Sequence, residues 1–181
     1  VWIIDPLDGT KDFIKQSGQY AMHLALAYEK EIVLGLVPIP SKNQLWIYLQ
    51  GKGTWYETPH SIQNIHINKS SLAMQDLTIL TSRSHVSPSF QRLLEKLCPK
   101  KVIGLGSVGY KIVSILSGEA DVYISYSSKN GSCPKDWDMA APFSLIKGAG
   151  GRFTDINSND LSFLKGDNFE QRGILVASIN Q

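Results

Sequence analysis

Apolar and polar positions alternate in short blocks along the first 60 residues of the chain. Residues 1–4 form an apolar run that predicts a buried strand. Four further strands are expected, each ended by a charged, glycine or proline turn, at residues 21–28, 32–37, 45–49 and 54–56. Because closely spaced strands joined by short turns pair as neighbours, this stretch predicts an antiparallel sheet. Residues 60–71 are polar, and we interpret them as an irregular connection.

From residue 77 onward, short apolar strands alternate with segments of helical spacing. The pattern predicts strands at residues 77–81, 101–103, 120–125, 152–154 and 174–178, and helices at residues 89–97, 110–116 and about 137–147. Such alternation is typical of an α/β layer packed on another sheet. We therefore predict a single domain over residues 1–181, an α/β (α+β layered) sandwich. Its antiparallel sheet half covers about 1–70, and a mixed α/β half follows at 77–181.

The hexapeptide Asp5-Pro6-Leu7-Asp8-Gly9-Thr10 follows directly on the first apolar run. Its two carboxylates, at the end of a strand, suit a hard cation such as Mg²⁺. Its glycine lets backbone N–H groups approach a ligand closely, and N–H groups at a helix start suit a phosphate. Asp-Gly alone is typical of a surface turn. The whole hexapeptide after an apolar strand instead predicts a metal-assisted phosphate site.

A second acidic centre, Asp136-Trp137-Asp138-Met139-Ala140-Ala141, lies far downstream, with Asp138 coming 130 residues after Asp8. Asp138 is near the start of a predicted helix, and the small residues after it let that helix pack closely against a neighbour. This packing would bring the Asp138 carboxylate to a shared site. The alternative is a carboxylate that only complements the helix dipole, which is common.

Taken together, the two segments resemble a known family. Asp-Pro-Leu-Asp-Gly-Thr resembles the first signature of the inositol monophosphatase-like family of Mg²⁺-dependent, Li⁺-sensitive phosphomonoesterases. Trp-Asp-x-Ala-Ala, followed by Gly148-Ala149-Gly150-Gly151, is similar to its second signature. The resemblance covers essentially the whole chain. It implies the inositol monophosphatase/fructose-1,6-bisphosphatase-like fold and two or three Mg²⁺ ions as cofactor.

The resemblance also implies roles for individual residues. Asp5 would bridge two Mg²⁺ ions, and the Leu7 carbonyl would ligate one of them. Asp8 and Asp138 would hold the other ion. The catalytic pair would be Asp5 and Thr10, with the Thr10 hydroxyl orienting a metal-activated water that attacks phosphorus directly.

Backbone N–H groups of Gly9 and Thr10 would meet the phosphate. The family expects a further metal-binding Glu upstream of the first signature. Since the chain begins at Val1, inside a predicted strand, we expect it to lack its N-terminal part and that Glu. We therefore hypothesise that these 181 residues alone are inactive or severely impaired as a catalyst.

The residues after the hexapeptide bear on the substrate. Lys11-Asp12-Phe13-Ile14-Lys15 is closer to the 3'(2'),5'-bisphosphate nucleotidases than to the Thr-Asn-Phe of inositol monophosphatases. This likeness implies removal of the 3'-phosphate from adenosine 3',5'-bisphosphate, and from its sulfated relative, in sulfur metabolism. The alternatives are an inositol or sugar-phosphate phosphatase with the same metal site, or a truncated, inactive fragment that only binds phosphate. A purely structural domain would leave both acidic signatures unexplained.

Several polar residues are candidates for contacts with such a nucleotide. Ser82-Arg83-Ser84-His85 resembles a nucleotide-contacting loop, although His85 could equally be a loop histidine without a ligand. The turn from Gly106 to Lys111 offers a hydroxyl and a cation for a second phosphate, or is simply a helix start. The candidate phosphate and substrate residues are Gly9, Thr10, Lys11, His85, Ser107, Lys111, Lys129 and Lys135.

Composition narrows the class of partner. Hydrophobic residues make up 43% and charged residues 19% of the chain, as in ordinary globular proteins, and the net charge of +2 argues against a nucleic-acid polymer as partner. No apolar run approaches the roughly 18 residues needed to cross a membrane. Cys98 and Cys133 favour two free thiols in a reducing compartment, the cytoplasm or an organelle stroma, over one disulfide. A small phosphorylated nucleotide remains the expected partner, and the sequence leaves the oligomeric state open.

The remaining histidines and aromatic residues have structural interpretations. His23 and His66 have no partner at ligand spacing, and we interpret both as structural. Trp46, Trp55 and Tyr56 are expected to pack on the first sheet.

Overall fold

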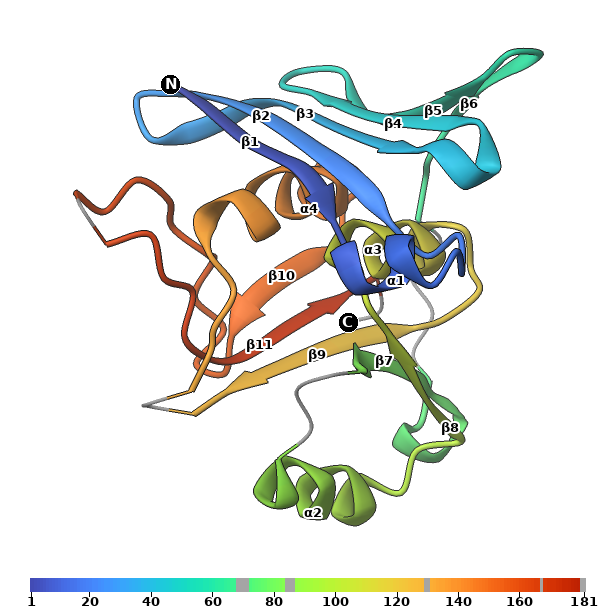
Figure 1. Cartoon of the computed structure of the whole chain (residues 1–181), viewed down its shortest axis with the longest axis vertical. Coiled ribbons are helices and arrows are strands. Elements are labelled where there is room, and N and C mark those ends of the chain that lie inside the picture. The colour runs from blue at the N-terminus through green and yellow to red at the C-terminus, as the bar shows by residue number, and fades with distance from the viewer. Residues whose placement is uncertain (68–71, 84–86, 129–130, 167, 180–181) are drawn as a thin grey trace.

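The computed structural model describes residues 1–67, 72–83, 87–128, 131–166 and 168–179. Two β-sheets lie on either side of a central pair of helices, α3 (Val108–Leu116) and α4 (Asp136–Gly148) (Figure 1). Helix α4 packs against strands of both sheets. The predicted layered α/β sandwich is thereby confirmed.

The first sheet is antiparallel throughout, and its strands follow one another in chain order. They are β1 (Trp2–Asp8), β2 (Ala21–Tyr28), β3 (Glu31–Ile39), β4 (Gln44–Leu49), β5 (Gly53–Thr58) and β6 (Ser61–Asn64). A short helix, α1 (Thr10–Ile14), joins β1 to β2, and a 3₁₀ turn (Pro40–Lys42) joins β3 to β4. Trp46 and Tyr56 are register partners whose rings stack with centroids 4.6 Å apart, which confirms the expected sheet packing.

Three boundaries in this half differ from the sequence prediction. Strand β1 continues through Asp8 instead of ending at residue 4, and β6 lies inside the stretch interpreted as irregular. All four residues of β6 are exposed, so the sequence shows no alternation of apolar and polar positions there. Backbone pairing with β5 alone makes this segment a strand. Strand β3 also runs past Pro38, which pairs with β4 only. Proline is tolerated there because its missing N–H faces a position with no β2 partner.

The second sheet is mixed, in the order β10-β11-β9-β7-β8. Strands β8 (Lys101–Leu105), β7 (Thr78–Ser82) and β9 (Val122–Ser127) run parallel, and β11 (Gly173–Ser178) and β10 (Arg152–Asp155) complete the sheet antiparallel. A 3₁₀ turn (Met74–Asp76) precedes β7. Helix α2 (Pro88–Leu97) packs Phe90 and Leu94 against the face of β7 and β9 that points away from the central helices.

Small residues allow α4 to lie close to the first sheet. A Cβ on Gly35 of β3 would overlap the Ser144 hydroxyl and lie 3.3 Å from the Ala141 carbonyl oxygen. Met139, Ala140, Leu145 and Ile146 are fully buried in the shared core. This close packing carries the start of α4 to the end of β1, where the two acidic signatures meet.

The face of the first sheet that points away from the helices is apolar. Trp2, Ile4 and Met22 are exposed there, and Ile4 is in register with Leu24 of β2. Cys98 is exposed and Cys133 buried, and both are free thiols as expected. None of the helices in the described ranges has the length and apolar character needed to cross a membrane.

Candidate metal and phosphate site

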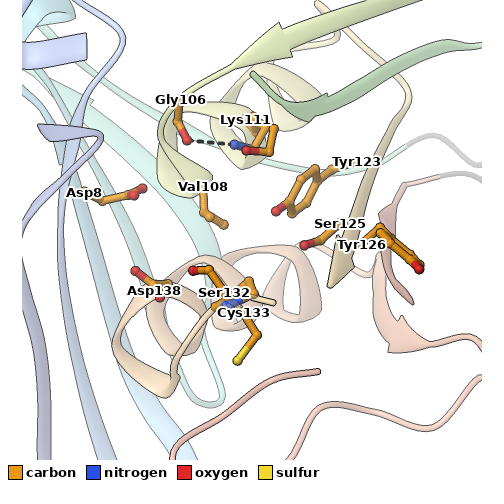
Figure 2. A pocket seen from close by; sticks show the side chains of 12 residues that line it. Asp8, Gly106, Val108, Lys111, Tyr123, Ser125, Tyr126, Ser132, Cys133 and Asp138 are labelled. Carbon is orange, nitrogen blue, oxygen red and sulfur yellow. Dashed lines mark hydrogen bonds between the residues drawn. The ribbon is translucent and has the colours of Figure 1, made fainter. Parts of the chain in front are cut away.

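Three carboxylates from two distant segments meet in one place. Asp5 and Asp8 lie on β1, and Asp138 lies in the first turn of α4. One oxygen of each lies within 4.8 Å of the others. Figure 2 shows Asp8 and Asp138 facing the same opening from β1 and from α4. The structure therefore brings together the three acids that the sequence signatures single out.

A β-bulge in β1 makes this convergence possible. Asp5 pairs with His23 and Asp8 pairs with Ala21, so three steps on β1 oppose two steps on β2. In a regular strand, side chains alternate between faces, and residues three apart would point to opposite sides. The extra residue of a bulge re-aims the side chain that follows it. Asp5 and Asp8 can therefore contribute to one cluster.

The loop after the bulge is fixed by its own polar groups. The Leu7 N–H donates to Asp5 Oδ1 at 3.0 Å, and the Thr10 hydroxyl donates to the Leu7 carbonyl at 3.1 Å. Gly9 adopts a φ of 87°, and a Cβ there would lie 3.1 Å from the Cβ of Ser107. Only glycine adopts this conformation at this close approach without strain. The predicted ligand carbonyl of Leu7 and the predicted water-orienting hydroxyl of Thr10 thus lie side by side.

Asp8 is a buried carboxylate with polar partners on β2 and at the start of α3. Its Oδ2 accepts hydrogen bonds from the Ser107 hydroxyl at 2.6 Å and from the Gly109 N–H at 3.1 Å. The same oxygen lies 3.2 Å from His23 Nε2. Burial would raise the pKa of Asp8, but the charges of His23 and Lys111 and these hydrogen bonds outweigh it and lower the pKa. Asp8 is therefore held as a carboxylate.

His23 is the buried partner of Asp8. Its Nδ1 lies 3.3 Å from the carbonyl oxygen of Trp137, so both ring nitrogens face oxygen acceptors. Burial favours the neutral ring, but the carboxylate of Asp8 outweighs burial, and the pKa of His23 is raised. The sequence interpretation of His23 as structural missed this contact. A polar side chain between Ala21 and Ala25 on the buried face of a strand was the available signal, because such groups need a partner.

Asp138 experiences the opposite electrostatic environment. Its Oδ2 accepts the Lys135 N–H at 2.6 Å, which caps the start of α4. Burial, together with the negative charges of Asp8 and Asp5, raises the pKa of Asp138 to about 6. Its neighbour Asp136 instead binds the Leu164 N–H and the Gln171 amide, on the other side of the helix start.

This donor set fits a hard divalent cation. Three carboxylates crowd one another, and burial together with the charges of Asp8 and Asp5 raises the pKa of Asp138. Oxygen ligands from aspartates and a backbone carbonyl are those that Mg²⁺ binds. Asp5, Asp8, Asp138 and the carbonyl of Leu7 would hold such an ion.

A cavity of about 250 Å³ opens beside the acids. Its walls come from the glycine-rich turn before α3, from β9 and from the segment before α4 (Figure 2). The lining residues are Asp8, Ser82, Gly106, Val108, Lys111, Tyr123, Ser125, Tyr126, Ser132, Cys133, Pro134 and Asp138. Carboxylates and hydroxyl groups thus line the same cavity.

Lys111 is the one basic side chain among these lining residues. Its Nζ donates to the carbonyls of Leu105 at 3.2 Å and Gly106 at 2.9 Å, as Figure 2 shows for Gly106. Burial lowers the pKa of Lys111 to about 8, against the charges of Asp8 and Asp12. The ammonium group therefore holds the glycine-rich turn from within, and contact with a second phosphate stays a prediction.

The other predicted substrate residues lie in varied positions. Ser107 has no exposed surface to offer a phosphate, because its hydroxyl binds Asp8 and caps α3 at the Tyr110 N–H. Lys11 is exposed on α1, and Lys135 forms an ion pair with Glu170 at 2.7 Å. His85 and Lys129 lie outside the described residues. Substrate roles for Gly9, Thr10, Lys11, Lys111 and Lys135 stay predictions.

An ion pair between Asp12 and Arg83 was not anticipated. Asp12 is buried in α1, and Arg83 reaches it from the end of β7 while also binding Gln19 and the Gly104 carbonyl. A Cβ on Gly106 would overlap the Asp12 carboxylate. The helix after the hexapeptide is thus tied to the second sheet beside the cavity. Arg83 itself lay in a loop that the sequence assigned to the nucleotide.

Two sheets around a helix pair, with a carboxylate cluster beside a polar cavity, support a hydrolase of the phosphatase class. The chain belongs to the inositol monophosphatase family, which matches residues 1–181. The resemblance drawn from the two signatures is thereby confirmed.

Relatives within the family include nucleotidases. The chain is 27% identical over 176 residues to the 3'(2'),5'-bisphosphate nucleotidase CysQ of Escherichia coli K12, covering 97% of the chain and 67% of that protein. It is 28% identical over 211 residues to 3'(2'),5'-bisphosphate nucleotidase 1 of Candida albicans, covering 98% of the chain and 56% of that protein. The chain therefore spans between about half and two thirds of the length of these relatives.

Solved structures agree on the fold. CysQ from Bacteroides thetaiotaomicron, described as a bacterial member of the inositol monophosphatase family, superposes with a TM-score of 0.80 at 25% identity, covering the whole chain and 70% of that structure. An inositol monophosphatase from Zymomonas mobilis gives a TM-score of 0.81 at 21% identity, over 99% of the chain and 65% of that structure. The predicted inositol monophosphatase-like fold is confirmed.

Proposed function

We propose that this protein is an Mg²⁺-dependent phosphomonoesterase that removes the 3'-phosphate of adenosine 3',5'-bisphosphate and of its sulfated relative. The observation that carries the proposal is the convergence of Asp5, Asp8 and Asp138 beside a polar cavity. Similarity to 3'(2'),5'-bisphosphate nucleotidases supports the substrate. The Lys11-Asp12-Phe13 continuation of the hexapeptide supports it as well.

The chain's own residues would divide the work. Bound Mg²⁺ would neutralise phosphate charge and lower the pKa of the attacking water. Asp5, Asp8 and Asp138 would hold the metal, and the Thr10 hydroxyl, which is anchored on the Leu7 carbonyl, would orient the water. The charges of His23 and Lys111 and the hydrogen bond from Ser107 keep Asp8 in its ionised form, and the Gly109 N–H donates to the same oxygen as Ser107. No covalent intermediate on the protein is required.

The wall opposite the acids would receive the remainder of the substrate. Ser125 and Tyr126 on β9 lie across the cavity from Asp8 and Asp138, and Ser132 lines the cavity beside Asp138 (Figure 2). Their hydroxyl groups are donors and acceptors for ribose and phosphate oxygens. Lys111 adds a buried positive charge to the same cavity.

The second candidate is an inositol or sugar-phosphate phosphatase with the same metal site. Lys111 is the one cation among the described lining residues, and its ammonium group is directed at two carbonyls. Among the described lining residues this leaves little free positive charge, which favours a substrate with one phosphate over a bisphosphate.

Parallel hydrolysis assays separate the two candidates. We expect the full-length protein that contains these residues, with Mg²⁺, to hydrolyse adenosine 3',5'-bisphosphate at least tenfold more efficiently than inositol 1-phosphate, and Asp138→Asn to abolish both activities. The reverse preference would replace the nucleotidase with the second candidate. Binding of phosphate without any turnover would indicate a non-catalytic phosphate-binding protein.

A further inference from the structure

His23 contacts both segments that carry the acids of the candidate metal site. From β2, its Nε2 lies 3.2 Å from Asp8 Oδ2, and its Nδ1 lies 3.3 Å from the carbonyl oxygen of Trp137. Trp137 directly precedes Asp138 in α4. The His23 side chain is 1% exposed, so both contacts are shielded from water.

The surrounding structure leaves room for an imidazole at this position. Gly109 of α3 faces the ring, and a Cβ there would overlap His23 Nε2 and lie 2.9 Å from the Cβ of Ala21. His23 Nε2 makes no hydrogen bond among the described residues, and the carboxylate of Asp8, 3.2 Å away, is its ion-pair partner there. Since a buried nitrogen needs a polar partner, the approach to Asp8 is the interaction that accounts for a histidine here.

Asp8 Oδ2 therefore accepts two hydrogen bonds, from the Ser107 hydroxyl and the Gly109 N–H, and His23 Nε2 approaches the same oxygen to ion-pair distance. An oxygen that is surrounded in this way fixes the rotation of the whole carboxylate. Groups that orient a metal ligand through its second polar atom commonly control metal affinity about 10- to 100-fold.

We propose that His23 is a positioning residue for the metal site, holding the Asp8 carboxylate through Nε2 while the Nδ1 contact with the Trp137 carbonyl fixes the ring. This inference rests on the proposed function, since it assumes that Asp8 binds the cation. The competing explanation is a purely structural role, in which His23 only fills the core and ties β2 to α4.

Two substitutions of similar size, glutamine and asparagine, test the roles of the two ring nitrogens of His23 separately. The amide nitrogen of glutamine reaches the place of Nε2, whereas that of asparagine reaches the place of Nδ1. His23→Gln keeps a donor for Asp8, His23→Asn keeps a donor for Trp137, and His23→Leu keeps neither. A structural role predicts no advantage of glutamine over asparagine in metal binding.

Thr54 offers a matched control. It is buried on β5, and its hydroxyl donates to the Leu145 carbonyl of α4 at 2.8 Å. Thr54→Val thus removes a buried contact between the first sheet and α4 without touching the acids. The measurement is the dissociation constant of Mg²⁺ alone, by isothermal titration calorimetry at pH 7.5, with the thermal midpoint of each metal-free variant recorded beside it.

We expect His23→Leu and His23→Asn to weaken Mg²⁺ binding at least about tenfold. His23→Gln should stay within about threefold of the wild type, and Thr54→Val should lower the thermal midpoint without changing Mg²⁺ affinity. Equal Mg²⁺ affinity of the glutamine and asparagine variants, or equal weakening by Thr54→Val, would overturn the inference. The Gln–Asn comparison decides the question even if His23→Leu fails to fold.

The variant Asp8→Asn distinguishes a failure of the positioning role of His23 from a failure of the proposed metal site. If Asp8→Asn loses Mg²⁺ binding while the His23 variants bind normally, the metal site stands and the positioning role of His23 fails. If Asp8→Asn binds Mg²⁺ as tightly as the wild type, the proposed metal site fails, and the positioning role fails with it.

Discussion

Asp8 and Ser107 lie 99 residues apart in the chain and share a buried hydrogen bond of 2.6 Å. The bond joins the last residue of β1 to the residue that caps α3, so one hydroxyl serves both a site carboxylate and a helix start. Ser87 likewise caps α2, by accepting a hydrogen bond from the Phe90 N–H, but it does not bind a carboxylate of the site. The two serines therefore form a natural comparison.

Replacing each serine with alanine should separate capping from support of Asp8. We expect Ser87→Ala to cost about 1 kcal/mol of unfolding free energy, as the loss of an N-cap does. Ser107→Ala should cost about 2–3 kcal/mol, because a hydrogen bond to a buried charge is lost as well. Urea unfolding monitored by circular dichroism measures both. Equal costs would mean that the Asp8 contact contributes nothing to stability.

The raised pKa of Asp138 predicts how metal binding depends on pH. Cation binding requires the carboxylate form, so Mg²⁺ affinity should fall as the pH drops through about 6. Calorimetric titrations between pH 5 and 8 test this expectation. An affinity that declines only below pH 4, near the ordinary pKa of an aspartate, would contradict it.

The same pKa makes a prediction about the metal-free protein. Because the pKa of Asp138 is about 6 in the folded state and 3.8 otherwise, the folded state binds the proton more tightly. Stability should therefore fall as the pH rises from about 4 to 6 on account of this group. Asp138→Asn should raise the thermal midpoint at pH 7.5 without metal and remove the stabilisation that Mg²⁺ gives. A lower midpoint in the variant would show that the carboxylates do not repel one another.

The three acids of the site could be predicted from the sequence because each belongs to a local pattern. Asp5 and Asp8 share one hexapeptide, and Asp138 starts a helix with small residues behind it. The alternation of strands and helices likewise predicted the layered fold and most strands to within a few residues. Strand β6 was not predicted, because all its residues are exposed and only its backbone pairing with β5 defines it as a strand.

Contacts set by long-range register were beyond the reach of local patterns. His23 meets Asp8 only because β1 carries a bulge opposite β2, and a change of one residue in register would turn His23 to the other face. Arg83 meets Asp12 because β7 and α1 come together in the folded chain, 71 residues apart. The hydrogen bond between Ser107 and Asp8 is a third such contact: the sequence predicted that Ser107 lies at a helix start, but not that it binds Asp8.

The Asp12–Arg83 ion pair should matter more than ordinary surface pairs. The Asp12 side chain is 5% exposed, whereas Asp160, which pairs with Lys147, is 53% exposed. We expect Asp160→Asn to change the unfolding free energy by less than about 0.5 kcal/mol. Asp12→Asn should cost more than about 1 kcal/mol, an amount kept modest because Arg83 is partly solvated. Similar values for the two variants in urea unfolding would assign no special role to the pair.

Gly109 provides the sharpest test of how α3 packs over the site. Alanine normally favours a helix interior over glycine by about 1 kcal/mol. At Gly109, however, a Cβ would overlap His23 Nε2 and lie 2.9 Å from both Ala21 Cβ and Val37 Cγ1. Gly109→Ala should therefore destabilise the protein by about 2 kcal/mol or more, in the range for overpacking a core.

A double-mutant cycle identifies the overlapping group. In a His23→Ala background the ring is gone, and Gly109→Ala should cost at least about 1 kcal/mol less than in the wild type, since neighbouring sites couple in this range. Unfolding free energies of the two single variants and the double variant complete the cycle. Additive costs would place the clash on Ala21 and Val37 instead of on His23. A positive coupling would establish that the missing side chain of Gly109 is what lets the imidazole reach Asp8.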